Sequence, residues 1–305
     1  MRITGLLTNT TPVPPQIESR PSTAPVGATP DMEIQVTTFA VSGGKGHTPA
    51  QLGSVACFAA MDDRLRVVMR TVQTYFPGVS DARHALQRGI FGVLRRPFEG
   101  DFRAITTFEL PADAVLLDIG ANRGQSIDAL RLVSPGRIVA FEPNVDLAEK
   151  LRKRYSRDSD ITIHALALGA ERGTFTLFVP VYNGFSFDGL ASLDEREATE
   201  WLMTRILRFN SRKLNIHRLE CHTVRLDDLS LSPSFIKIDV QGTELQVLQG
   251  SLETLAQYRP VLLIENAELA IIDFLSRLGY RPYSWERGRL IPNRIGKLNT
   301  FFMVA

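Results

Sequence analysis

The chain has 305 residues, of which 44% are hydrophobic and 22% charged, the composition of a globular protein with a sizeable core. Its formal net charge of +2, without any stretch that interleaves basic and aromatic residues, argues against a nucleic-acid partner. Cys57 and Cys221 are too few for a disulfide framework, no apolar run is long enough to span a membrane, and no secretory signal is visible. We therefore expect a cytoplasmic protein; its oligomeric state stays open, a homodimer included.

Two segments are expected before the α/β domain. Residues 1–55 are rich in Thr, Pro, Gly and Ser and predict a flexible tail, in which Gly43–Gly46 is a linker because it lacks the spacing of a phosphate loop. Residues 56–110 predict a helical extension or lid, with helices over Met61–Phe76 and Asp81–Leu94.

An α/β domain is expected over residues 111–305, and it is organised around the stretch Val115–Gly124. An apolar run ends in Asp118, and Gly120 and Gly124 bracket the turn that follows. A strand that is apolar throughout suits a parallel sheet covered by helices on both faces. We expect Gly120 to allow a backbone geometry that a side chain would block, and Gly124 to let the backbone approach a ligand at a helix N-terminus.

A second apolar run, Ile138–Phe141, ends in Glu142, whose carboxylate suits a ribose diol. Two nucleoside ligands fit: NAD or S-adenosyl-L-methionine (SAM). Asn122 stands where the dinucleotide fingerprint has its second glycine, which disfavours a pyrophosphate. Asp118 is also compatible with the ammonium of a methionine tail, so SAM is favoured over NAD, and a structural turn without a ligand is the third alternative.

The rest of the domain alternates helical and strand patterns. Helices are expected over Ser126–Leu132, Val145–Tyr155, Glu195–Phe209, Thr243–Leu255 and Glu268–Leu278. Strands are expected over residues 161–165, 174–179, 217–226, 235–240, 260–264 and 299–304, with a strand or hairpin over 280–290. Residues 170–225 form an insertion that we expect to wall the acceptor pocket. Tyr182, Phe185, Phe187 and Trp201 would either line that pocket or belong to the core.

Five segments occur in an order that resembles the FkbM-type SAM-dependent methyltransferases: Leu117–Gly124, Val139–Pro143, Ala165–Gly169, Leu226–Leu229 and Ile236–Leu245. The resemblance runs from about Ala114 to the C-terminus. It implies an α/β fold of the Rossmann-like class I methyltransferase type, with a seven-stranded, mostly parallel sheet whose last strand is antiparallel. The N-terminal helical extension would precede this domain.

The resemblance also implies an activity, the transfer of a methyl group from SAM to a hydroxyl of a sugar, a glycolipid or a secondary metabolite. The cofactor-binding residues expected from it are Asp118, Gly120, Asn122, Gly124, Gln125, Ser126, Glu142, Ala165, Leu166 and Asp239. Ala165 and Leu166 would contact the adenine.

The catalytic candidates follow two neighbouring strands. Asp239 is the first candidate for a general base, and Glu265 is the second. Lys237 could pair with Asp239 or Glu244, or reach solvent. Gln241 stands where the family most often has Glu, which puts in doubt any role of that position as a base.

Three alternatives stay open. Asp239 with Glu265-Asn266 resembles the oxygen ligands of catechol-type O-methyltransferases, which suit Mg²⁺, but the FkbM resemblance does not require a metal and we do not favour one. An NAD-dependent oxidoreductase is disfavoured by Asn122 and by the terminal hairpin. A methyltransferase-like protein that binds a partner without turnover is disfavoured by the intact motifs.

Overall fold

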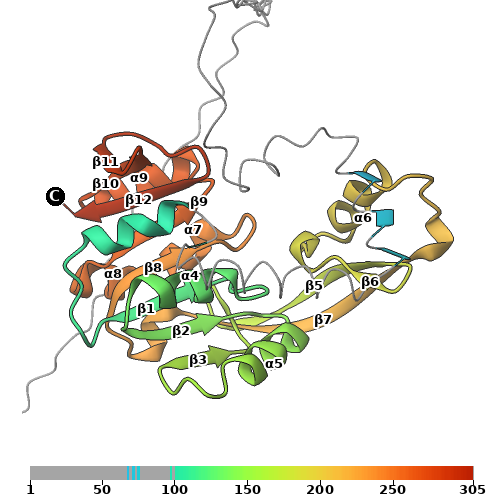
Figure 1. Cartoon of the computed structure of the whole chain (residues 1–305), viewed down its shortest axis with the longest axis horizontal. Coiled ribbons are helices and arrows are strands. Elements are labelled where there is room, and N and C mark those ends of the chain that lie inside the picture. Colours follow the sequence, from blue (N-terminus) through green and yellow to red (C-terminus); the bar gives the residue numbers. More distant parts are fainter. Residues whose placement is uncertain (1–66, 69–70, 73, 76–96, 98–99, 305) are drawn as a thin grey trace, which may run out of the picture. The chain divides into compact units, whose positions relative to one another are not determined.

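The computed structural model describes residues 67–68, 71–72, 74–75, 97 and 100–304, all of which fall in the compact unit Ser54–Ala305 (Figure 1). The tail expected over residues 1–55 and the helix expected over Asp81–Leu94 lie outside the described residues. Of the helix expected over Met61–Phe76, the six described residues are helical.

The larger of two sheets has eight strands in the order β11-β10-β12-β9-β8-β1-β2-β3. The strands are β1 Val115–Ile119, β2 Arg137–Phe141, β3 Ile161–His164, β8 Pro233–Ile238, β9 Val261–Glu265, β10 Tyr280–Glu286, β11 Arg289–Pro292 and β12 Asn299–Val304. The neighbours from β3 to β9 pair in parallel, and β12 lies antiparallel between β9 and β10. The predicted α/β fold with an antiparallel last strand is confirmed. The predicted strand number of seven is wrong, because β11 pairs with β10 and adds an eighth strand.

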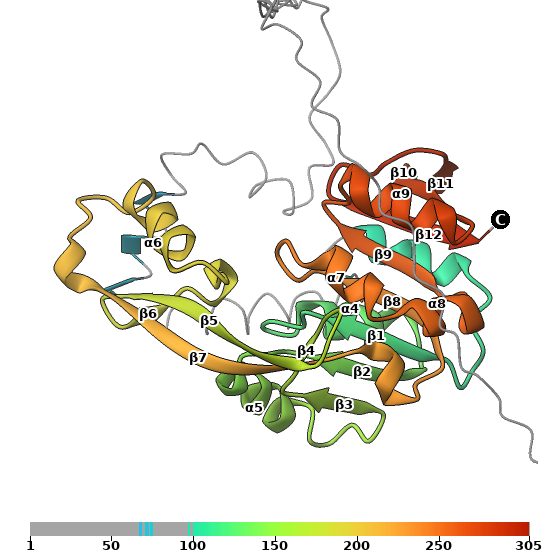
Figure 2. The same cartoon turned by 180° about the vertical axis from the view of Figure 1, so that it is seen from behind.

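Helices cover both faces of this sheet, as the apolar strands require. They are α4 Gln125–Val133, α5 Val145–Arg154, α7 Glu244–Gln249, α8 Leu252–Tyr258 and α9 Leu269–Arg277, with the 3-10 helices η1 Gly100–Thr107 and η4 Leu226–Leu229. Alternate residues of the central strands enter two separate cores. On β1, Leu116 packs in the core shared with η1, α4 and α5, whereas Leu117 packs in the core shared with α7, α8 and α9. Figure 2 shows the same arrangement from behind.

The helix expected over Thr243–Leu255 is two helices, α7 and α8, separated at Gly250. The backbone of Gly250 lies so close to the carbonyl group of Gly169 that a Cβ at position 250 would collide with its oxygen. The helix is thus interrupted at a weak helix former that is also packed against the backbone of Gly169. The helix expected over Glu195–Phe209 is also shorter, because α6 ends at Met203.

The insertion predicted over residues 170–225 forms a second sheet of its own, with the order β4-β7-β5-β6. The strand β4 Ala167–Leu168 precedes the predicted insertion and joins this sheet. The elements within the insertion are β5 Gly173–Tyr182, β6 Phe185–Ser186, β7 Leu214–Val224, α6 Glu195–Met203 and the 3-10 helices η2 Asp188–Leu190 and η3 Ser211–Lys213. β5 and β7 pair antiparallel along their whole common length. Three of the aromatic residues weighed as pocket walls, Tyr182, Phe185 and Phe187, form the core of this insertion with Leu202 and Ile206.

The contact at Gly250 gives a test of how the second sheet joins the first. Gly250→Ala is expected to lower the free energy of unfolding by about 2–4 kcal/mol, because backbone on both sides must move to admit the methyl group. Gly173→Ala is the matched control, since a Cβ there meets no atom within 4 Å, and it should change stability by less than about 0.5 kcal/mol. Urea unfolding of both variants checks this, and equal stabilities would contradict the contact.

Candidate active site

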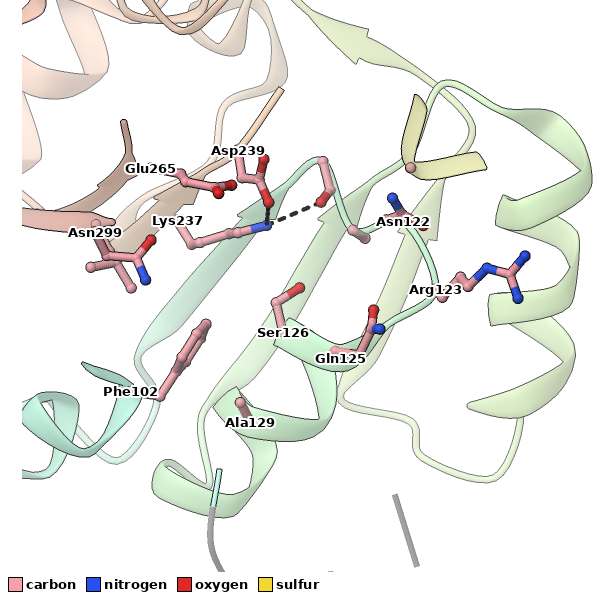
Figure 3. Close-up of a pocket in the computed structure, with 14 residues that line it drawn as sticks. Phe102, Asn122, Arg123, Gln125, Ser126, Ala129, Lys237, Asp239, Glu265 and Asn299 are labelled. Carbon is pink, nitrogen blue, oxygen red and sulfur yellow. Dashed lines mark hydrogen bonds and ion pairs between the residues drawn. The ribbon is translucent and has the colours of Figure 1, made fainter. Parts of the chain in front are cut away.

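Two cavities open at the carboxyl ends of the parallel strands. The Glu142 cavity, of about 330 Å³, is lined by residues that include Phe141, Glu142, Leu147, Leu166 and Phe175. The Lys237 cavity, of about 310 Å³, is lined by residues that include Phe102, Gln125, Ser126, Lys237, Glu265 and Asn299 (Figure 3). Four residues line both cavities: Gly120, Asn122, Gly189 and Asp239. The two cavities therefore meet at the turn after β1, which is where open α/β sheets bind ligands.

The glycines of this turn are required by the packing of the chain itself. Gly120 has φ +83°, and a Cβ there would collide with the carbonyl oxygen of Asp239. Gly124 also has φ +83°, and its Cβ would lie 2.7 Å from Leu151 Cδ2 and 2.8 Å from the hydroxyl of Tyr155, both on or next to α5. Gly124 is absent from the lining of both cavities. Its positive φ is therefore required by the contact with α5, and the close approach to a ligand that the sequence suggested stays a prediction.

Asp118 is fully buried, with 0% of its surface exposed, and lines neither cavity. Its Oδ2 accepts a hydrogen bond from Ser126 Oγ at 2.5 Å, and its Oδ1 lies 3.3 Å from Lys237 Nζ. The contacts of Asp118 are therefore with Ser126 and Lys237, which both line the Lys237 cavity.

Lys237, on β8, is 8% exposed. The alternative that this lysine reaches solvent is therefore wrong. Its ammonium donates to the Gly120 carbonyl at 3.1 Å and lies 3.3 Å from carboxylate oxygens of Asp118 and Asp239 (Figure 3). Burial lowers the pKa of Lys237, but the two carboxylates raise it by more, so the net shift is upward. The side chain stays charged at neutral pH and cannot take a proton. The other expected partner, Glu244, accepts from the backbone N–H groups of Val240 and Gly242 instead.

Asp239 directly follows β8 and is held as a carboxylate. Gln241 Nε2 donates to its Oδ1 at 2.8 Å, and Lys237 Nζ lies 3.3 Å from its Oδ2. Burial raises the pKa of Asp239, but the Lys237 ammonium and the hydrogen bond from Gln241 hold it below its usual range. At position 241 an amide supplies a donor to Asp239, which a glutamate carboxylate would not do.

Glu142 is 6% exposed and lines the other cavity. Its Oε2 accepts from the backbone N–H of Asn122 at 2.7 Å, and its Oε1 accepts from that of Asn144 at 2.9 Å. Burial nevertheless raises its pKa to about 7, and the nearby charges of Asp118 and Asp188 act in the same direction. Each oxygen keeps a lone pair for a further donor, so the carboxylate suits a ligand that carries two hydroxyls.

The two residues expected beside the adenine separate in the structure. Leu166 lines the Glu142 cavity, whereas Ala165 packs against the core on the α5 side of the sheet. The cavity also has apolar walls from Leu147 and Phe141, and His164 stacks on Phe141 with ring centroids 5.2 Å apart.

The insertion closes over the junction of the cavities. Arg123, next to the glycine turn, makes a 2.6 Å ion pair with Asp188, which also accepts from Ser186 Oγ at 2.6 Å. Gly189 follows, and a Cβ there would lie 4.0 Å from Asn122 Nδ2. Sequence reasoning did not single out these contacts, and Arg123 and Asp188 are 65 residues apart in the chain.

Sequence reasoning also missed Asn299 and Phe102, which line the Lys237 cavity. Asn299 begins β12 and pairs in register with Glu265 at the end of β9. A polar residue at the start of an otherwise apolar final strand was the available signal. Phe102 comes from η1, within the extension that was expected to be helical.

The carboxylate of Asp239 has the Lys237 ammonium beside it, where a magnesium centre would have the metal ion. Within the described part of the chain, no group of three or more His, Cys, Asp or Glu residues is arranged to hold a metal ion. The Lys237 ammonium lies between Asp118 and Asp239, where it supplies positive charge to Asp239 from within the protein. The magnesium layout weighed for Asp239 and Glu265-Asn266 is therefore not supported. None of the described helices has the length and apolar character needed to cross a membrane.

Comparisons with known proteins bear on this site. The AMB antimetabolite synthetase AmbE of Pseudomonas aeruginosa is 29% identical over 178 residues, which cover 50% of this chain and 8% of that protein. The chain thus spans less than a tenth of the length of this curated relative.

Two solved structures are similar at low identity. The methyltransferase FkbM of Methylobacillus flagellatus is 16% identical with a TM-score of 0.41, over 65% of this chain and 47% of that one. A SAM-dependent O-methyltransferase of Thermotoga maritima is 12% identical with a TM-score of 0.32, over 66% of this chain and 63% of that one. In both cases the chain covers less than two thirds of the other protein.

The family described as the methyltransferase FkbM domain matches residues 118–282, which is more than half of the chain. This match begins at Asp118 and contains Glu142, Lys237, Asp239 and Glu265, the residues around which the two cavities are built. It confirms the resemblance drawn from the ordered segments: the chain belongs to the FkbM methyltransferase family.

Proposed function

We propose that this chain is a SAM-dependent O-methyltransferase that transfers a methyl group to a hydroxyl of a small molecule: a sugar, a glycolipid or a secondary metabolite. Membership of the FkbM family supports the methyltransferase class over the oxidoreductase alternative. The observation that carries the cofactor assignment is the pair of joined cavities, one with a diol-binding carboxylate and one that continues across Gly120 to the start of α4.

The residues of the Glu142 cavity fit a nucleoside. The Glu142 carboxylate would accept the two ribose hydroxyls, and Leu147 and Leu166 would pack against the adenine. Asn122 keeps its backbone N–H on Glu142 and thereby holds the carboxylate in place.

The residues of the Lys237 cavity fit the amino-acid end of SAM. Gln125 and Ser126 lie in the first turn of α4, where free backbone N–H groups and the helix dipole favour a carboxylate. Gly124 and Ala165, absent from the lining of both cavities, would then support the cofactor through packing, and Asp118 would support it through Ser126 and Lys237.

SAM supplies a methyl group on a sulfonium, so the protein has to bind the cofactor, orient the acceptor and accept one proton. The acceptor hydroxyl must lose its proton as it attacks, and a nearby carboxylate favours this. Asp239 and Glu265 both line the Lys237 cavity, whereas Lys237 keeps its charge and serves to position Asp239. We assign to these carboxylates the role of accepting the proton of the acceptor hydroxyl. The insertion would form the wall of the acceptor site, because its Gly189 lines both cavities.

The curated relative is a reason to keep secondary metabolites among the acceptors. It is described as an antimetabolite synthetase, and the similarity covers only 8% of its length. A synthetase of this kind makes small molecules, and the same class of acceptor fits cavities of a few hundred Å³.

Transfer of a labelled methyl group tests the proposed reaction. With methyl-labelled SAM and a panel of sugars, glycolipids and hydroxylated metabolites, label should enter an ether linkage of one acceptor class. Asp239→Asn should lower turnover by about 10²–10⁴-fold, because the carboxylate is lost, while S-adenosylhomocysteine still binds. Near-normal turnover in Asp239→Asn would remove Asp239 from catalysis; binding of S-adenosylhomocysteine without label in any acceptor would favour a binding protein.

The pKa of Glu142 predicts a pH dependence of cofactor binding. A ribose diol needs an ionised carboxylate with free lone pairs, and Glu142 is protonated below about pH 7 in the ligand-free protein. The affinity for S-adenosylhomocysteine should therefore rise with pH, by about tenfold from pH 6 to pH 8.

The matched variants separate this carboxylate from general charge effects. Glu142→Gln should abolish the pH dependence and weaken binding at pH 8 by about 10–100-fold. Glu149→Gln removes an exposed carboxylate from α5 and should bind like the unmodified protein. Calorimetric titration measures both, and equal affinity at pH 6 and pH 8 in the unmodified protein would refute the role of Glu142.

A further inference from the structure

The carboxylate of Asp239 is held from two sides, with one contact in each cavity. Asp239 lines both cavities, whereas Lys237 lines the first of them and Gln241 lines the Glu142 cavity. Lys237 Nζ lies 3.3 Å from Oδ2 of Asp239 (Figure 3), and Gln241 Nε2 donates a hydrogen bond to Oδ1 at 2.8 Å. The two oxygens of the proposed general base therefore have different partners.

The two contacts constrain the carboxylate differently. The Lys237 ammonium also lies 3.3 Å from Asp118 and donates to the Gly120 carbonyl, so it is shared among three groups. An ammonium acts as a point charge with little dependence on direction, whereas a short N–H···O hydrogen bond favours a nearly linear approach. The amide of Gln241 is thus the contact that fixes the rotation of the carboxylate. Since a carboxylate can only accept, the amide nitrogen and not the amide oxygen has to face it.

Gln241 reaches this position from a backbone conformation that is uncommon for its residue type. Its φ is +58°, in the left-handed region that glycine and, less readily, asparagine and aspartate adopt. Asn122, after β1, and Asn266, after β9, also have positive φ at this edge of the sheet, but both are asparagines. A strained residue of this kind persists where the surrounding contacts hold it.

Glu244 supplies the contacts that hold the loop. Its Oε1 accepts from the backbone N–H groups of Val240 at 3.3 Å and Gly242 at 3.1 Å, and its Oε2 accepts from that of Gly242 at 3.1 Å. These two N–H groups stand on either side of Gln241 in the chain. The carboxylate of Glu244 therefore stabilises the backbone from which the amide reaches Asp239.

We propose that Gln241 is a positioning residue of the methyl transfer, whose amide orients the Asp239 carboxylate toward the acceptor hydroxyl at the junction of the cavities. This inference rests on the proposed function, because it takes Asp239 as the group that accepts the proton. The hydroxyl proton moves to Asp239, the hydroxyl oxygen gains the methyl group, and the electron pair of the broken carbon–sulfur bond stays on sulfur. Gln241 exchanges no proton, and each oxygen of Asp239 keeps a lone pair for the hydroxyl.

The amide acts on Asp239 beside several charged groups. Lys237 of β8 adds a positive charge, Glu265 of β9 lines the same cavity, and Glu244 of α7 binds the neighbouring loop. Burial raises the pKa of Asp239, whereas the Lys237 ammonium and the hydrogen bond from Gln241 lower it. Removal of the amide alone should therefore raise this pKa, because the charges around Asp239 stay in place.

Three variants separate the amide from the backbone that carries it. Gln241→Gly removes the amide and relieves the left-handed strain, whereas Gln241→Met removes the amide and keeps the strain and the chain length. Arg287→Gly is the matched control, because Arg287 has φ +50° in the turn between β10 and β11 and lines neither cavity. Both glycine variants should keep or raise the midpoint of urea unfolding, which excludes unfolding as the cause of a lost activity.

The pKa of Asp239 in the ligand-free protein gives a readout that needs no cofactor. A carbon-13 NMR titration of protein labelled at the aspartate carboxyl groups measures it, and Asp239→Asn identifies the signal. The pKa should be higher in Gln241→Gly and in Gln241→Met than in the unmodified protein, and unchanged in Arg287→Gly. An unchanged pKa of Asp239 in both Gln241 variants would overturn the inference.

Methyl transfer measures the catalytic consequence. In both Gln241 variants kcat should fall by about 5–50-fold, while the affinity for S-adenosylhomocysteine changes by less than about threefold. Arg287→Gly should keep the kcat of the unmodified protein. A normal kcat in both Gln241 variants, or a loss in Gln241→Gly alone, would overturn the role of the amide and leave the proposed function in place. If the unmodified protein transfers no methyl group to any acceptor, the proposed function fails and the inference fails with it.

Discussion

A single buried ammonium group holds the site together. Lys237 Nζ contacts the Gly120 carbonyl and lies 3.3 Å from carboxylates of Asp118 and Asp239. Desolvating this charge is costly, and the two carboxylates offset the cost only if all three groups keep their places. The ammonium therefore links the end of β8 with β1 and with the turn that follows β1.

The geometry of both cavities depends on this link. Gly120 packs directly on the Asp239 backbone. In the same turn, the backbone N–H of Asn122 donates to Glu142. A continuous series of contacts thus runs from Asp239, in the Lys237 cavity, to Glu142, in the other cavity. The Arg123–Asp188 ion pair connects the insertion to the turn that follows β1.

Much of the fold was predictable, because each buried strand is an apolar run and each turn carries its own signal. The bounds of the elements were less predictable. α7 and α8 separate where Gly250 meets Gly169, and the strand or hairpin expected over residues 280–290 is the antiparallel pair β10 and β11, which continues to Pro292. Glu142, Asp239 and Glu265 were identified because strand ends gather at one edge of the sheet. The inward orientation of Asp118 was not predictable from its position alone. For Lys237 the sequence left pairing with Asp239 or Glu244 and exposure to solvent as alternatives, and only the structure shows that it is buried between Asp118 and Asp239.

The free energy of unfolding of Lys237→Met, of Asp118→Asn and of the double variant tests the organising role of the ammonium most directly. Lys237→Met alone should lose about 3–5 kcal/mol, because it leaves Asp118 buried without its cation. The double variant should lose clearly less than the sum of the two single variants, since the neutral amide no longer needs the ammonium. Strictly additive losses, or a Lys237→Met variant as stable as the unmodified protein, would contradict the account.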